Sequence, residues 1–188
     1  MSTSPPPGHI ELIAGSMFSG KSEELIRRCK RALIAKQNIQ VFKPVIDDRY
    51  SEDEVVSHSD TRIPSTPVPD AETLLSLVEE DTDVVAIDEV QFMGTDIIDA
   101  CTTLADRGCR VIAAGLDTDS DGNAWGVTAA LFCIAEVVTK LYAVCVQCHS
   151  HYATRSFHIG ETVKSEQVEV GGVNQYEARC RRCFNAGR

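Results

Sequence analysis

The chain reads Gly15-Ser16-Met17-Phe18-Ser19-Gly20-Lys21-Ser22 near its N-terminus, and this stretch matches the phosphate-binding pattern GxxxxGK[ST]. Its glycines let the backbone fold tightly enough for successive N–H groups to point at phosphate oxygens, and a following helix would add its positive end. Lys21 would then place its ammonium on the outer phosphates, and the Ser22 hydroxyl would ligate magnesium. The stretch predicts a nucleoside triphosphate site.

The sequence on both sides of this loop has the periodicity that the motif requires. Residues 9–14 (HIELIA) are typical of a short strand, and residues 21–36 have a helical period. The helix is expected to bury one face, made of Leu25, Cys29, Ala32 and Leu33. An ordinary Gly- and Ser-rich turn is the alternative interpretation, which the strand-loop-helix context disfavours.

The rest of the chain alternates strand-like and helix-like segments. Strands are expected at 40–43, 84–87, 110–115 and 135–141, helices at 71–77 (capped by Asp70) and 95–107, a loop at 44–59, and buried core at 127–138. This order predicts an α/β phosphate-loop (RecA-like) fold, a parallel sheet with flanking helices and its ligands at the carboxyl ends of the strands. We expect a tail at 1–8, a nucleotide-binding core at 9–142 and a small zinc-binding unit at 143–188.

Composition limits the partners. The net charge of −10, from 28 acidic and 18 basic residues, repels nucleic acid and anionic lipid at long range, so no nucleic-acid partner is expected. The start MSTSPPPG lacks the apolar core of a secretory signal, and no run approaches the ~18 apolar residues of a membrane span. These observations predict a cytoplasmic protein without a membrane partner.

A second acidic site follows the apolar run at 84–87. A buried strand that ends in Asp88 would deliver a carboxylate to magnesium, opposite the hydroxyl of Ser22. Glu89 would point to the other side of the strand end and serve as general base for an attacking hydroxyl. A solvated strand end is the alternative for this pair. Arg49, in the loop after the second strand, could neutralise charge on the phosphates, but a solvated loop arginine is nearly as good an interpretation.

Four of the eight cysteines form two C-x-x-C pairs, Cys145 with Cys148 and Cys180 with Cys183, which predict a closed, structural zinc site. A redox or disulfide pairing is the alternative. The segment between the pairs is longer than the usual ~15–20 residues of a zinc ribbon, so it could close over a substrate. The other cysteines are expected to be buried apolar residues: Cys29, Cys101, Cys109 and Cys133. His149 and His151, beside the first pair, are expected to face solvent, with a role as surplus metal ligands as the alternative.

Taken in order, seven motifs carry a resemblance: GSMFSGKS, DDRYS, IDEVQF, GLD, VTKLYAVCVQC, VEVGGVNQY and CRRC. They resemble the thymidine kinase family that joins a phosphate-loop core to a small zinc domain, in its bacterial-type members. The resemblance runs from about Ile10 to Cys183. It implies a homotetramer that transfers the γ-phosphate of MgATP to the 5′-hydroxyl of thymidine, and of deoxyuridine.

The resemblance also implies roles for single residues. The ATP site would comprise residues 15–22 with Arg49, Asp88, Glu89, Val90 and Gln91, and Glu89 would be the proton acceptor. The nucleoside would contact Met17, Phe92, Leu116, Thr154, Tyr176 and a lasso-like loop with Val168, Glu169, Val170, Gly171 and Gly172. Gly171 and Gly172 would let the backbone approach a flat base closely. The four paired cysteines would bind zinc.

Several positions depart from the family pattern. Ser120 stands where the family usually has phenylalanine, Trp125 lies within Ala-Trp-Gly in place of Pro-Phe-Gly, Val90 replaces a glycine and Met93 an aromatic residue. Loss of one aromatic face would remove stacking worth ~1–3 kcal/mol, which Trp125 could restore. We therefore expect weaker or broader nucleoside selection.

Two other functions stay open at this point. One is a phosphate-loop ATPase in which Glu89 orients water instead of a hydroxyl. The other is a zinc-ribbon nucleic-acid-binding module, which the net charge of −10 disfavours.

Overall fold

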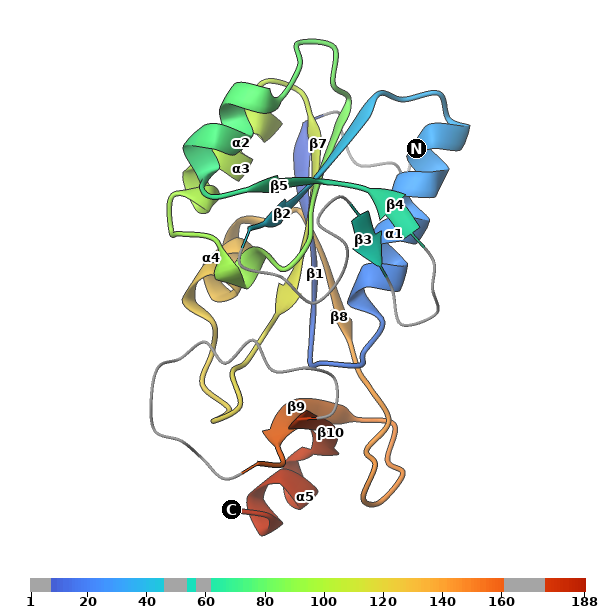
Figure 1. The fold of residues 1–188 in the computed structure, drawn as a ribbon, viewed down its shortest axis with the longest axis vertical. Coiled ribbons are helices and arrows are strands. Elements are labelled where there is room, and N and C mark those ends of the chain that lie inside the picture. The colour runs from blue at the N-terminus through green and yellow to red at the C-terminus, as the bar shows by residue number, and fades with distance from the viewer. Residues whose placement is uncertain (1–7, 46–53, 57–61, 161–174) are drawn as a thin grey trace.

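Six parallel strands form the central sheet of the chain (Figure 1). The computed structural model describes residues 8–45, 54–56, 62–160 and 175–188. The sheet has the order β5-β2-β6-β7-β1-β8, and its strands are β1 (His9–Gly15), β2 (Ile39–Pro44), β5 (Thr66–Val68), β6 (Val84–Ile87), β7 (Arg110–Leu116) and β8 (Val137–Leu141). The predicted α/β fold with a parallel sheet is confirmed.

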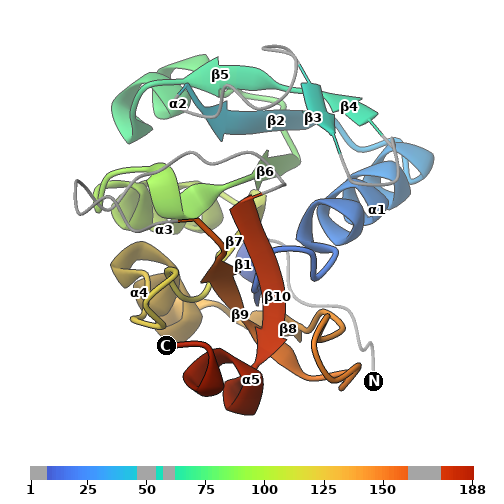
Figure 2. The ribbon, with the colours of Figure 1, turned by 60° about the horizontal axis from the view of Figure 1, so that its bottom comes forward.

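Helices cover both faces of this sheet (Figure 2). They are α1 (Lys21–Ile34) on one face, and α2 (Ala71–Leu77), α3 (Ile97–Asp106) and α4 (Gly126–Ile134) on the other. Every residue of β1 and β6 is buried, as expected for parallel strands with a helix on each side. The same layers bring the carboxyl ends of β1, β6 and β7 to one edge of the core.

The buried face of helix α1 agrees with the prediction at three of its four expected residues. Leu25, Cys29 and Ala32 are buried against the sheet as predicted, and Ile26 is buried with them. Leu33 is 52% exposed, so its predicted burial is wrong. Ile26 fills the side of the apolar stripe that Leu33 was expected to fill.

The predicted loop at 44–59 contains a strand that periodicity missed. β3 (Glu54–Val56) pairs in antiparallel register with β4 (Arg62–Pro64), outside the main sheet. Val55 and Ile63 are buried in the cluster that α1 covers. Three residues among charged neighbours are too few to show an alternation, so a loop was expected there. The helix at 71–77 is confirmed with its cap, because Asp70 Oδ1 accepts from Thr73 N at 2.7 Å.

The apolar run at 127–138 is only partly buried. Val127 and Leu131 lie in the core, but Phe132 is 50% and Ile134 40% exposed. Cys133 is exposed, so its predicted burial is wrong, whereas Cys29, Cys101 and Cys109 are buried as predicted. The run forms α4 and part of β8 at the edge of the sheet, where an element is covered on one side only.

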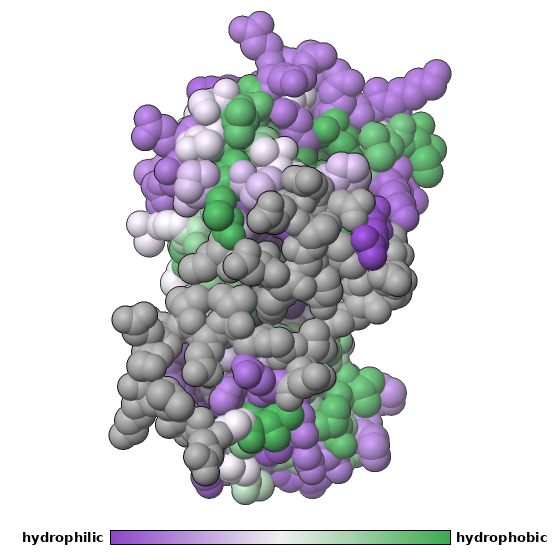
Figure 3. Space-filling view, viewed as in Figure 1, coloured by the Kyte–Doolittle hydropathy of each residue, from purple (hydrophilic) through white to green (hydrophobic). Residues whose placement is uncertain are grey.

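The described surface is mixed in character. On the face drawn in Figure 3, hydrophilic residues dominate the upper part and apolar residues appear among them as separate patches. Within residues 8–45, 54–56, 62–160 and 175–188, no helix has the length and apolar character needed to cross a membrane.

A smaller C-terminal unit lies against the carboxyl edge of the sheet (Figure 1). Its strands β9 (Ala153–His158) and β10 (Tyr176–Cys180) pair antiparallel, and α5 (Arg181–Ala186) follows directly. Its small core contains Ala143, Cys145, Ala153 and Ala178.

Candidate functional site

The phosphate-binding stretch forms the turn between β1 and α1, as the motif predicts. Gly20 has φ +85°, a conformation that favours glycine, and it precedes the first residue of α1. A Cβ on Gly15 would lie 2.6 Å from Ser19 Oγ and 2.7 Å from the backbone oxygen of Leu141. Only a bare backbone therefore fits there, and the turn presents its amides beside the positive end of a 14-residue helix.

Lys21 is buried at the start of α1, and its Nζ donates to the backbone oxygen of Ser16 at 3.0 Å. The side chain thus folds back across the turn, which places the ammonium among the loop amides. Such a charge is suited to the outer phosphates of a triphosphate.

Ser22 and Asp88 meet at the opening of the turn. Ser22 Oγ donates to Asp88 Oδ2 at 3.0 Å. Burial and the neighbouring Glu89 carboxylate raise the pKa of Asp88 to about 7, against the lowering effect of Lys21 and Ser22. A buried carboxylate and a hydroxyl in contact are oxygen ligands of the kind that magnesium prefers, and a bound cation would favour the ionised Asp88.

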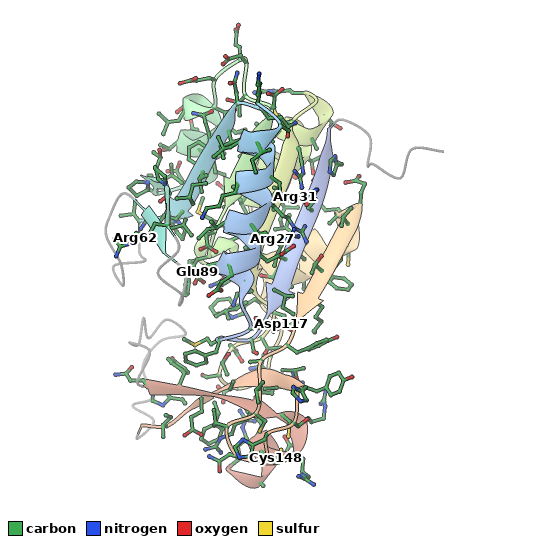
Figure 4. All side chains as sticks on the ribbon, turned by 90° about the vertical axis from the view of Figure 1, so that its right-hand side faces the viewer. Arg27, Arg31, Arg62, Glu89, Asp117 and Cys148 are labelled. Carbon is green, nitrogen blue, oxygen red and sulfur yellow. The ribbon has the colours of Figure 1, made fainter. Side chains whose placement is uncertain are left out.

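Glu89 has a strained backbone, with φ +50°, directly before the short helix η1 (Val90–Phe92). Gln91 Nε2 donates to a carboxylate oxygen of Glu89, and Gln91 Oε1 accepts from the backbone N–H of Leu116 at 2.9 Å. Gln91 therefore ties the Glu89 carboxylate to the end of β7. Figure 4 shows Glu89 at the edge of the core that faces the C-terminal unit.

Aromatic side chains line the neighbouring part of this edge. The rings of Phe92 and Trp125 pack edge to face with centroids 5.8 Å apart. Among the described residues, Trp125 Nε1 and Thr128 Oγ1 are buried polar atoms without a hydrogen-bond partner. Leu116 ends β7, and Ser120 lies in the connection from β7 to α4. Apolar faces with a few orphaned polar groups are typical of a small-molecule site.

The four paired cysteines converge in the C-terminal unit. Their sulfur atoms all lie within 4.8 Å of one another, and Cys148 Sγ is 3.6 Å from Cys180 Sγ. Tetrahedral zinc with Zn–S bonds of about 2.3 Å places sulfurs ~3.8 Å apart, so this donor set fits zinc. Burial raises the pKa of Cys145, but backbone N–H groups of Cys180 and Cys148 outweigh burial and lower it to about 6. His149 and His151 are exposed, as expected.

Tyr176 and Thr154 lie in the same unit, on β10 and β9. The Tyr176 ring packs edge to face on His158, with centroids 5.1 Å apart. Thr154 Oγ1 accepts from Arg155 Nη1 at 3.3 Å. Arg49 and the stretch 168–172 lie outside the described residues, so their predicted contacts stay predictions.

Sequence reasoning missed Ser156, which reaches the phosphate loop from β9. Its Oγ accepts from the backbone N–H of Met17 at 3.0 Å, and Ser16 Oγ donates to the backbone oxygen of Ala153 at 3.0 Å. No spacing in the sequence marks this contact, because it arises only when the C-terminal unit packs on the core.

Comparisons with known proteins agree with this geometry. The family model described as thymidine kinase matches residues 8–184. A thymidine kinase of Bacteroides fragilis is 49% identical over 177 residues, which cover 94% of this chain and 87% of that protein. One of Bacteroides thetaiotaomicron is 48% identical over 181 residues, covering 96% and 89%. One of Bdellovibrio bacteriovorus is 50% identical over 177 residues, covering 94% and 85%. The matched range includes the phosphate loop and all four paired cysteines.

Proposed function

This chain belongs to the thymidine kinase family, and we propose that it transfers the γ-phosphate of ATP to the 5′-hydroxyl of thymidine and of deoxyuridine. The observation that carries the proposal is the carboxyl edge of the sheet. There the phosphate loop, the Ser22–Asp88 contact and the Glu89 carboxylate held by Gln91 lie together.

The loop residues would bind the triphosphate. Backbone amides of the loop after Met17, whose own N–H donates to Ser156, and the ammonium of Lys21 would hold the β- and γ-phosphates. Ser22 and Asp88 would hold the magnesium of the MgATP complex, which neutralises charge on the transferring phosphoryl group. Arg49 would add a further charge there.

Glu89 would accept the proton of the 5′-hydroxyl. Its backbone is fixed at the end of β6, and Gln91 orients the side chain, so little freedom remains to be lost when a hydroxyl approaches. A positioned base contributes typically ~10²–10⁴ in rate, and the rest of the catalysis would come from alignment and charge neutralisation.

The nucleoside would lie between the core and the C-terminal unit. The edge-to-face pair Phe92 and Trp125 offers an apolar wall, and Met17, Leu116, Ser120, Thr154 and Tyr176 would complete the site together with 168–172. Zinc on the four cysteines would fix the C-terminal unit structurally, since all four ligand positions are filled by thiolates. Residues 9–142 and 143–188 would accordingly serve as nucleotide-binding core and zinc-binding unit.

We further propose a cytoplasmic homotetramer. Helix α4, the edge strand β8 and the residue that follows it expose apolar side chains, which a second copy could cover: Phe132, Ile134, Val138 and Tyr142. Sedimentation of the intact protein as a monomer at micromolar concentration would remove this part of the proposal.

The decisive experiment is label transfer from [γ-³²P]ATP to a panel of deoxynucleosides with magnesium present. Labelled thymidine and deoxyuridine monophosphates, with no label on purine deoxynucleosides, are expected. Release of labelled phosphate at the same rate with and without any nucleoside would instead favour an ATPase in which Glu89 orients water.

A further inference from the structure

The phosphate loop contacts the C-terminal unit through three consecutive residues. Ser16 bonds to the backbone of Ala153, and the Met17 N–H bonds to Ser156, both at 3.0 Å. Ser16, Ala153 and Ser156 are buried, so these bonds are shielded from water. The first half of the loop is thus held from outside the core.

Phe18 makes the third contact, and it is apolar. Its side chain packs on the cluster of Ala143, Cys145, Ala153 and Ala178, the same cluster on which Cys148, Cys180 and Cys183 pack. The Phe18 backbone has φ +63°, a conformation that a residue with a Cβ rarely adopts, and its ring contacts the cluster on which the cysteines pack.

These contacts attach the first half of the loop to the C-terminal unit. The Met17 N–H donates to Ser156 Oγ on β9, and the backbone turns at Phe18, which has a positive φ, directly after this bond. If the cysteine cluster became less ordered, the turn at Phe18 would become less ordered too, because the Phe18 ring packs on that cluster. A loop that lost the three contacts would lose its attachment to β9 and to the cysteine cluster.

We propose that the four-cysteine site and the phosphate loop are energetically coupled, with Phe18 and Ser156 as the positioning residues that connect them. Zinc at the cysteines then raises the affinity of the loop for triphosphate. By thermodynamic reciprocity, triphosphate raises the affinity of the cysteines for zinc by the same factor. The inference rests on the proposed function, since it takes zinc as the metal and MgATP as the ligand.

The test measures both affinities on the full chain. Calorimetry gives the dissociation constant of a non-hydrolysable MgATP analogue for zinc-loaded and chelator-stripped protein. Competition with a chromogenic chelator gives the zinc dissociation constant with and without the analogue. Coupling of the usual size predicts that each ligand tightens the other by about fivefold or more.

Two variants and one control locate the connection. Ser156→Ala removes the acceptor of the Met17 N–H, and Phe18→Gly removes the ring while accepting the positive φ without strain. Both should lose most of the coupling and bind the analogue roughly five- to tenfold more weakly in the zinc-loaded state. Ser150→Ala is the matched control, because Ser150 Oγ accepts from Tyr152 N inside the same unit, and it should retain wild-type coupling.

These binding measurements distinguish a failure of the coupling from a failure of the proposed function. Wild-type protein that binds no zinc or no analogue would contradict the proposed function itself. Wild-type protein that binds both, with each dissociation constant indifferent to the other ligand, would overturn the coupling while leaving the proposed function intact. Since this comparison needs no substitution, it holds even where a variant fails to fold.

Discussion

Ser22 Oγ donates to Asp88 Oδ2 at 3.0 Å although 66 positions of the chain separate the two residues. Ser22 lies in the first turn of α1, and Asp88 follows the last residue of β6. The strand β7 lies between β6 and β1 in the sheet, so the contact spans two strand spacings at the carboxyl edge. The hydroxyl and the carboxylate therefore meet because the sheet order brings the ends of β1 and β6 to the same edge.

Replacement of Glu89 by glutamine should slow phosphoryl transfer by about 10²–10⁴, because the amide cannot accept the proton of the attacking hydroxyl. Glutamine keeps an oxygen toward Gln91, so affinity for MgATP should stay near that of wild type. Single-turnover transfer and calorimetry measure the two quantities. Glu80→Gln, at an exposed position after α2, is the control. A near-normal turnover rate in Glu89→Gln would remove Glu89 from the mechanism.

Gly15→Ala should weaken nucleotide binding by about 1–3 kcal/mol, since the new methyl group would overlap the Leu141 backbone at 2.7 Å and displace the turn. Titration with MgATP measures the loss. Gly126→Ala, at the first position of α4, adds the same methyl group where no described atom outside its own turn of helix lies within 4 Å, and its melting temperature should match or exceed that of wild type. Equal nucleotide affinity in Gly15→Ala and wild type would show that the turn is not confined at this position.

Glu11→Gln should destabilise the fold in a pH-dependent manner. Glu11 is buried on β1, where Arg110 Nε and Arg28 Nη1 donate to it at 2.7 and 2.6 Å. Burial raises the pKa of Glu11, but hydrogen bonds from Arg110 and His9 outweigh burial and leave the pKa below 4.5, the value of an exposed glutamate. The ionised form is thus favoured by folding, and its contribution is full above about pH 4.5 and lost as the pH falls through the lower folded value.

Urea unfolding at a series of pH values checks this expectation. The glutamine variant should be about 3–5 kcal/mol less stable at neutral pH, because the buried guanidinium of Arg28 and the half-buried one of Arg110 lose their anion. The gap should narrow as the pH falls below 4.5. Glu72→Gln, on the exposed side of α2, should show no comparable gap. If the difference in unfolding free energy between wild type and Glu11→Gln is constant from pH 7 to 3, the loss of stability comes from altered packing and not from the lost charge.

Ser120→Phe should sharpen nucleoside selection, because it restores the aromatic residue that the family usually has at this position, with stacking worth ~1–3 kcal/mol. The measurement is kcat/KM for thymidine and deoxyuridine. Asp121→Phe is the matched control, since it adds the same ring at the neighbouring position, whose carboxylate accepts from Arg188 Nη2 at 2.7 Å. If the ratio of the two kcat/KM values is the same in wild type and Ser120→Phe, the hypothesis of broader selection is wrong.

Most of the fold could be predicted from the sequence, because most strands and helices of the core have a local hydrophobic pattern or a capping residue that identifies them. The phosphate loop, the apolar run before Asp88 and the Asp70 cap each specify a short segment and its ends. Leu33, Phe132 and Cys133 were misjudged because burial at the end of a helix or at a sheet edge depends on what packs there, which period alone does not contain. Ser156 could not be found from sequence for the same reason, since its partner lies 139 positions away.

The chain carries a single tryptophan, Trp125, and its ring lies against Phe92 at the proposed nucleoside wall. All of its indole fluorescence therefore originates beside the site, with no background from the rest of the molecule. A nucleoside that enters there would change the polarity around the indole and shift its emission. The native protein is thus its own optical sensor, and binding can be followed in real time without a dye.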